Sequence, residues 1–207
     1  PPNPGGPGDF LWRTNTNWRN NNSDPQNAPP NNVLPGINDV VNIALNNGSP
    51  GPGSGQYTPV RVQGGDDFEV DSMRVGANPG LGVGGHGDLI IEGGELRILN
   101  HAPDPTVSVA NGPQPARGSL NLGYDGRTGN VEVSSGTLEV GTDFSLGLQD
   151  GSTGVYTQTG GTVSVNRNLY VGRIATGEFN LEDGTFNFGN TLYVGGDPDG
   201  NANAAPN

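Results

Sequence analysis

The chain has 207 residues, a formal net charge of −12, nine arginines, no lysine and no cysteine. The lack of cysteine excludes disulfides, thiolate catalysis and cysteine metal sites. The acidic charge argues against a nucleic-acid partner, because phosphate binding depends on Lys and Arg. No run approaches the roughly 20 apolar residues that a helix needs for membrane insertion.

The first segments predict a tail and a cap. Residues 1–9 are rich in proline and glycine, as extended tails are. The chain opens with Pro1 rather than methionine, which fits a processed form or a fragment, and both fit secretion. Residues 10–62, which hold Trp12 and Trp18, are interpreted as an N-terminal cap and first irregular coil. The tryptophans would plug the open apolar end that a stack of repeats must cover.

A run of carboxylates follows, with Asp67, Glu69 and Asp71 at alternating positions. In a strand this spacing places the three side chains on one face. Carboxylate oxygens gathered in this way suit Ca²⁺, the only cofactor that the sequence suggests. The alternative is a solvated acidic edge that binds no ligand, and we favour this alternative.

A repeat of about 24 residues organises residues 63–200. Each regular copy has a Thr-Gly pair followed by a Gly-Thr pair, as in Thr128-Gly129 and Gly136-Thr137. An apolar-x-apolar-Gly run, such as residues 120–123, introduces each copy. An insertion at about 100–118 separates a degenerate copy from the regular ones, and residues 201–207 are assigned to a C-terminal tail.

Short runs of alternating apolar and polar residues predict three short strands in each copy. Three such strands cannot bury their apolar face alone, so the copies must stack with equivalent strands about 4.8 Å apart. The predicted fold is therefore all-β, a single-stranded parallel β-helix (β-solenoid) of about 24-residue coils with an N-terminal cap.

The repeat also predicts which residues face inward, although a shift of one residue would exchange the two faces. The expected inward rows are Leu122, Leu146, Val171 and Val194 on the first strand, Val131, Tyr156 and Phe179 on the second, and Leu138, Val163 and Phe186 on the third. A shared corner, where a positive φ favours glycine, is expected at Gly123, Gly147, Gly172 and Gly195.

Asp125 and Asp150 precede glycine at equivalent positions of successive copies. Asp-Gly is a strong turn former, which explains both pairs without a function. Stacked carboxylates repel unless a cation or Arg127 lies between them, so bound Ca²⁺ is the second interpretation.

Tyr170 and Tyr193 are also equivalent, and we expect them to form an exposed aromatic stack. Such a stack contacts sugar rings or another subunit, or it simply stabilises the sheet. The sequence leaves both interpretations open.

Several motifs together resemble a known family. They are Asn17-Trp18, residues 35–43 (Pro-Gly-Ile-Asn-Asp-Val-Val-Asn-Ile), and the Leu-Tyr-Val-Gly runs at 169–172 and 192–195. Over roughly residues 10–200 the chain is similar to secreted bacterial parallel β-helix repeat proteins, such as autotransporter passenger-type and PEP-CTERM-associated repeats. The resemblance implies an exported surface or matrix protein and supplies no catalytic residues.

We therefore expect a noncatalytic structural protein, extracellular or at the cell surface, that self-assembles into a fibre or layer. Assembly would use end-to-end or strand-addition contacts, because a last strand at residues 192–194 leaves an edge that invites pairing. One alternative is an adhesin or glycan-binding module with a polysaccharide partner, and another is a polysaccharide-degrading enzyme. The candidate assembly or ligand contacts are Trp12, Trp18, Tyr170, Tyr193, Leu192 and Val194.

Overall fold

The computed structural model describes residues 10–11, 34, 37, 40–43, 59–76, 86–100 and 116–196. In these residues the structure is all-β, with strands β1 to β13 and no helix. Consequently, none of the described segments is a helix long and apolar enough to cross a membrane. Every strand pairing is parallel.

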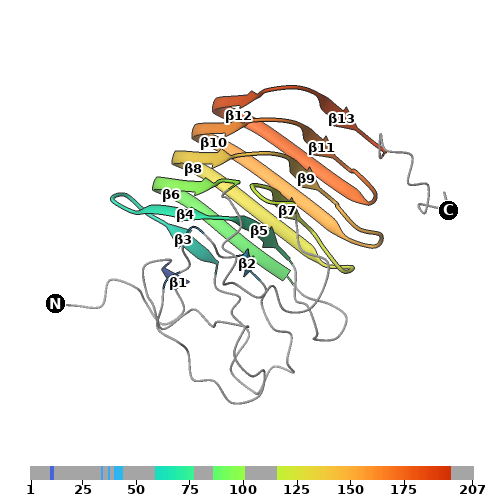
Figure 1. The fold of residues 1–207 in the computed structure, drawn as a ribbon, viewed down its shortest axis with the longest axis horizontal. Helices are drawn as coiled ribbons and strands as arrows, with labels where there is room; N and C mark the ends of the chain where they lie inside the picture. The colour runs from blue at the N-terminus through green and yellow to red at the C-terminus, as the bar shows by residue number, and fades with distance from the viewer. Residues whose placement is uncertain are drawn as a thin grey trace, which may run out of the picture.

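The strands form two sheets (Figure 1). Sheet A contains β1 (Phe10–Leu11), β3 (Val60–Val62), β4 (Asp67–Val70), β6 (His86–Ile98), β8 (Thr128–Val140), β10 (Thr153–Val165) and β12 (Thr176–Phe188). Sheet B contains β2 (Val40–Ile43), β5 (Ser72–Val75), β7 (Leu120–Leu122), β9 (Phe144–Leu146), β11 (Leu169–Val171) and β13 (Leu192–Val194). From β5 onward the chain alternates between the sheets, so each strand lies beside its equivalent in the next copy.

Equivalent residues of successive copies pair in the predicted register. In sheet B, the row runs through Leu122, Leu146, Val171 and Val194. In sheet A, one row runs through Val131, Tyr156 and Phe179, and another runs through Leu138, Val163 and Phe186. The row members of β7 to β10 are buried in the apolar core, so the predicted inward faces are confirmed and the shifted register is wrong.

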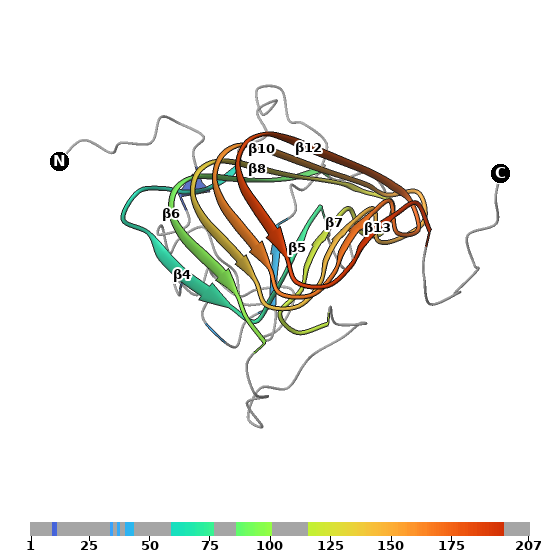
Figure 2. The ribbon, with the colours of Figure 1, turned by 90° about the horizontal axis from the view of Figure 1, so that it is seen from above.

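The number of strands in each copy differs from the prediction. The expected second and third strands run together as one strand of 13 residues in β6, β8, β10 and β12. Each of these long strands bends midway (Figure 2). The pairing register is irregular at the bend, where Gly136, Gly161 and Gly184 have positive φ. Glycine allows the backbone to turn there without breaking the ladder.

Residues 10–62, expected to be the cap and first irregular coil, contribute β1, β2 and β3 to the two sheets. Trp12 and Trp18, the expected plugs of the cap, lie outside the described residues. The same is true of residues 101–115, which make up most of the predicted insertion.

The predicted glycine corner is confirmed, with φ values of +74°, +68°, +70° and +67° at Gly123, Gly147, Gly172 and Gly195. A Cβ added at Gly147 would lie 2.4 Å from the carbonyl oxygen of Thr176 in the next copy. At Gly195, in the last described copy, an added Cβ meets nothing within 4 Å. The two positions therefore share a backbone conformation and differ in packing.

We expect Gly147→Ala to destabilise the fold far more than Gly195→Ala. Both variants pay about 1–2 kcal/mol for a side chain in the left-handed region. Gly147→Ala also drives its Cβ into a backbone carbonyl, so its total cost is expected to exceed about 4 kcal/mol. Urea unfolding of both variants, followed by circular dichroism, measures the difference. Equal losses would show that packing between copies does not restrict this corner.

Candidate assembly interface

Among the described residues the stack ends at β12 and β13, each of which pairs with one described neighbour only (Figure 1). β12 presents an edge of 13 residues and β13 an edge of three. Unpaired N–H and C=O groups along such an edge are a template for a further strand. No other described strand of 13 residues has an unpaired side, because β6, β8 and β10 each have neighbours on both sides.

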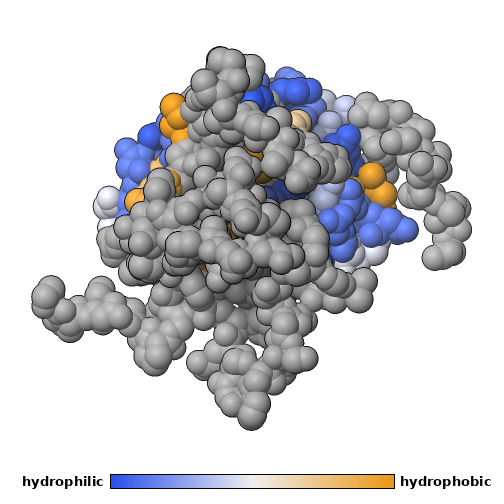
Figure 3. Space-filling view, turned by 60° about the horizontal axis from the view of Figure 1, so that its bottom comes forward, coloured by the Kyte–Doolittle hydropathy of each residue, from blue (hydrophilic) through white to orange (hydrophobic). Residues whose placement is uncertain are grey.

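The apolar core is open at this end. Leu181, Phe188, Leu192 and Val194 are 49%, 41%, 46% and 72% exposed. Each continues an inward row of the core; Val194, for example, follows Val171. These side chains are exposed because no further copy covers them among the described residues. On the face seen in Figure 3, by contrast, the described surface is mostly hydrophilic.

Aromatic packing connects the open end to the core. The ring of Phe179 stacks on Tyr156 with centroids 5.1 Å apart, and Phe186 meets Phe179 edge to face at 4.9 Å. Tyr156 in turn packs edge to face on Phe144 in the buried part of the core. The apolar side chains at this end are therefore in contact with the core through a chain of aromatic rings.

The opposite end of the same rows is closed. Val41 and Ile43 of β2 begin the rows that end at Leu192 and Val194. They are only 3% and 4% exposed. The two ends of the stack therefore differ, with apolar side chains buried at the first strand of sheet B and exposed at the last.

The open end carries an acidic rim. Glu178, Glu182 and Asp183 on β12 are exposed. The Asn180 side chain donates a hydrogen bond to Glu178 (2.8 Å), and the Gly184 N–H donates one to Asp183 (2.7 Å). Residues 174–196 contain no lysine or arginine, so β12 and β13 supply no positive charge to balance these carboxylates.

The predicted Tyr170–Tyr193 stack is present, with ring centroids 4.9 Å apart and planes at 7°. Its expected exposure is wrong for Tyr170, which is 6% exposed. The Arg173 guanidinium lies over the Tyr170 ring at 4.6 Å, and the side-chain amide of Asn168 donates to its hydroxyl. Only Tyr193, at the open end, is partly exposed.

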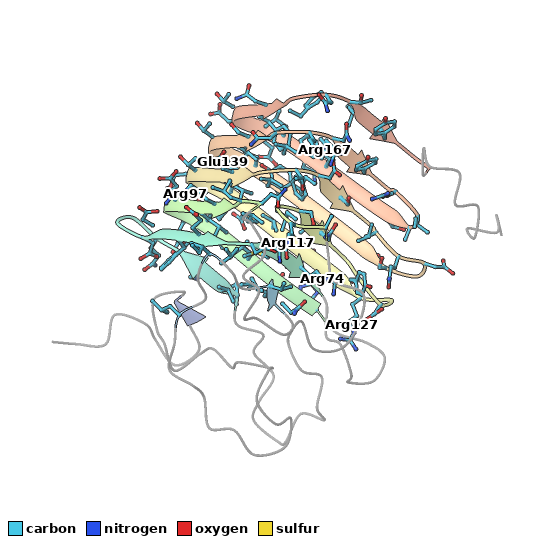
Figure 4. The ribbon with its side chains drawn as sticks, viewed as in Figure 1. Arg74, Arg97, Arg117, Arg127, Glu139 and Arg167 are labelled. Atoms are coloured by element: carbon cyan, nitrogen blue, oxygen red, sulfur yellow. The ribbon has the colours of Figure 1, made fainter. Side chains whose placement is uncertain are left out.

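The predicted acidic cluster is divided between two arginines rather than gathered around a cation. Arg97 donates hydrogen bonds to Asp67 (2.6 Å) and Glu69 (3.0 Å), whereas Asp71 is buried and lies 3.3 Å from Arg117. In Figure 4 the two arginines are well separated, and Arg97 lies beside Glu139 on the next strand. The structure thus does not bring Asp67, Glu69 and Asp71 together as calcium ligands.

Asp125 and Asp150 occupy the same corner of successive copies, as predicted. A Cβ added at Gly151 would lie 3.8 Å from the Cα of Gly126, so the two Asp-Gly turns are stacked. Both aspartates are exposed, and Asp125 has a φ of +55°. Across the described residues, no three acidic or histidine side chains are arranged to hold a metal ion. The shared corner is thus confirmed, and calcium binding by this pair stays a prediction.

Arg97 neutralises carboxylates from two strands, because it also contacts Glu95 at 2.9 Å. Its hydrogen bonds to Glu95 and Glu69 raise the pKa of Arg97 above the ordinary value. We expect Arg97→Gln to lower the free energy of unfolding by about 1–2 kcal/mol, since partly exposed ion pairs are individually weak. Salt should reduce this loss by screening the carboxylates from one another. Thermal melts at low and high salt, with Arg167→Gln as a more exposed control, check both expectations.

Sequence reasoning missed part of the candidate interface. It named Leu192 and Val194 as contacts but not Leu181 and Phe188, although the alternation of apolar and polar residues places both on the inward face of the last copy.

No protein-family model, curated protein or solved structure matches this chain.

Proposed function

We propose that the chain is a parallel β-solenoid that serves as a noncatalytic structural protein and assembles with its own copies through the β12/β13 end. The observation that carries the proposal is the combination of two strand edges without a described partner and an exposed cross-section of the apolar core. An additional layer would bury Val194 and Leu192 as Val171 and Leu169 are covered within the chain. Main-chain hydrogen bonds along β12 would align the strand of the added layer.

The setting that we propose is extracellular or at the cell surface, in a fibre or layer. The resemblance to secreted β-helix repeat proteins supports this setting, and parallel ladders need no disulfides to persist there. The three carboxylates of the predicted acidic cluster also support a noncatalytic role, because Asp67 and Glu69 pair with Arg97, and Asp71 pairs with Arg117.

Sedimentation velocity over a concentration series, combined with negative-stain electron microscopy, tests the proposal on the full chain. We expect assemblies larger than the monomer that grow with concentration and show regular contacts in images. A monomer at every concentration would overturn self-assembly.

A glycan-binding surface module is the second candidate, and the partly exposed ring of Tyr193 favours it. A planar aromatic ring stacks on sugar rings, and the Tyr170 ring beneath holds it flat. Retention of a monomer on immobilised polysaccharide, lost in Tyr193→Ala, would replace the assembly proposal with this one. Retention unchanged in Tyr193→Ala would exclude this ring as the contact.

A further inference from the structure

We infer that His86, Asp88 and Asn130 form a binding site for a divalent transition metal on the outer face of sheet A. The site is separate from the proposed assembly contact, because β10 lies between this part of the sheet and β12. His86 and Asp88 alternate with Gly87 and Leu89 along β6, so their side chains leave the sheet on the face opposite the buried Leu89. Asn130 on β8 is the register partner of Asp88.

Three side-chain atoms of this cluster lie within hydrogen-bonding distance of one another. His86 Nε2 is 2.8 Å from Asp88 Oδ1 and 3.1 Å from Asn130 Nδ2. Asn130 Nδ2 also donates a hydrogen bond to Asp88 Oδ1 at 3.0 Å. Two ligand atoms that lie about 2.1 Å from one ion and at right angles to each other are about 3.0 Å apart. The triangle of atoms therefore has the size of one face of a metal coordination shell.

Hydrogen bonds alone do not satisfy all three atoms. An ionised Asp88 oxygen only accepts hydrogen bonds, and the Asn130 nitrogen only donates them. His86 Nε2 contacts both atoms. When Nε2 carries a proton, its N–H faces the N–H of Asn130, and when Nε2 has a lone pair, that lone pair faces the Asp88 oxygen. One of the two contacts to His86 is therefore repulsive in either tautomer.

The Asn130 amide can supply an oxygen ligand in place of its nitrogen. Its Oδ1 is buried and accepts no hydrogen bond from the described residues. A half turn of the amide exchanges the positions of its oxygen and nitrogen. A neutral imidazole nitrogen, a carboxylate oxygen and an amide oxygen then face one point. A cation at that point converts the three contacts into attractive ones.

The chemistry of the three ligands selects the metal. An imidazole nitrogen suits Zn²⁺ and similar transition metals, whereas Ca²⁺ takes oxygen ligands. The side chains of His86 and Asp88 are 34% and 22% exposed, so an ion can reach them and water can complete its shell. Three protein ligands with an open position are also the pattern of catalytic rather than structural zinc sites. The set differs from a group of three acidic or histidine side chains because its third ligand is an amide.

Calorimetric titration of Zn²⁺ into the chelator-treated full chain, with Ca²⁺ titrated in parallel, tests the site. His86→Gln removes the nitrogen ligand, and His101→Gln is the matched control at the other histidine of the sequence. Asn130→Ala removes the amide, whereas Asn130→Asp places a charged oxygen there. Thermal melts in chelator show which variants remain folded. Nuclear magnetic resonance of the two histidine rings in the unmodified chain identifies the ligand without any substitution at His86, since His101→Gln assigns the signals.

We expect one Zn²⁺ per chain, no Ca²⁺ binding at the same concentrations, and a zinc-induced shift of the His86 ring signals alone. Affinity should fall at least about tenfold in His86→Gln and Asn130→Ala, because even residues behind the ligands contribute that much. It should stay unchanged in His101→Gln and rise in Asn130→Asp.

Three results would overturn the inference. The first is no saturable Zn²⁺ binding, and the second is binding that is unaffected by His86→Gln. The third is binding that depends on His86 but not on Asn130, which would remove the amide from the shell. If His86→Gln does not fold, the ring signals of the unmodified chain decide, and an unshifted His86 signal contradicts the site.

Discussion

Val194→Asp is expected to abolish self-association while leaving the monomer folded. Val194 is 72% exposed, so an aspartate there stays hydrated in the isolated chain. In an assembly the carboxylate would be buried against apolar side chains, which costs at least about 3 kcal/mol. Because each 1.4 kcal/mol is tenfold in affinity, association should weaken by more than about 100-fold.

Sedimentation and thermal melts of Val194→Asp separate the two effects. The matched control is Ser134→Asp, which adds the same charge at an exposed bend of β8, away from the open end. We expect the control to associate as the unmodified chain does. If Val194→Asp associates normally, the open end is not the contact; if it unfolds, Val194 contributes to the monomer more than its exposure indicates.

Substitutions of Gln158 and its partner Tyr156 are expected to show the strongest coupling of unfolding free energies in the core. Gln158 is a fully buried polar residue with four side-chain hydrogen bonds. Its side-chain oxygen accepts from the Tyr156 hydroxyl at 2.9 Å. Its side-chain nitrogen donates to the carbonyls of Gly160, Gly161 and Thr185 at 3.1–3.2 Å. Burial raises the pKa of Tyr156, so the hydroxyl remains protonated and donates to Gln158 at neutral pH.

In the adjacent copies apolar residues replace the pair of Tyr156 and Gln158. On β8 the equivalent positions are Val131 and Val133. On β12 they are Phe179 and Leu181. We expect Gln158→Leu to cost about 2–3 kcal/mol, because the buried Tyr156 hydroxyl loses its acceptor. Tyr156→Phe should cost about 1–2 kcal/mol for the converse reason.

The double variant Tyr156→Phe/Gln158→Leu copies the next strand and removes both partners. Its cost should be well below the sum of the single costs, with a coupling of about 1–3 kcal/mol. Urea unfolding of the four proteins in the cycle measures this coupling. Thr157→Val, on the outer face of the same strand, serves as a control and should be nearly neutral. Additive losses would mean that the hydrogen bond between the two side chains contributes nothing.

The sequence predicted the features that depend on local periodicity. Alternation in runs such as 131–133 and 138–140 identified the inward faces, because side chains of a strand point to opposite sides in turn. Recurring glycines such as Gly147 marked the corner, because few other residues adopt a positive φ there. Stacking of the copies then followed from the need to bury an apolar face that one copy cannot cover.

Contacts between side chains of different copies were not predictable in this way. The sequence placed Asp67, Glu69 and Asp71 on one face. Their partners are distant in the sequence: Arg97 lies 30 positions after Asp67, and Arg117 lies 46 positions after Asp71. Periodicity reports the direction of a side chain and not which charge lies opposite. For this reason the spacing of the carboxylates could not distinguish a calcium site from a network of ion pairs with arginine.

The sequence by itself determined the repeat, the register of the rows and the glycine corner, because alternation and backbone sterics act within a few residues. Only the tertiary structure decided that each long strand continues through its bend, that Tyr170 is buried beside Arg173, and that Val41 is covered while Val194 is open. The reason is that burial depends on what lies above and below each row. That neighbour is another copy about 24 residues away, or, at the β12/β13 end, no described residue of the chain.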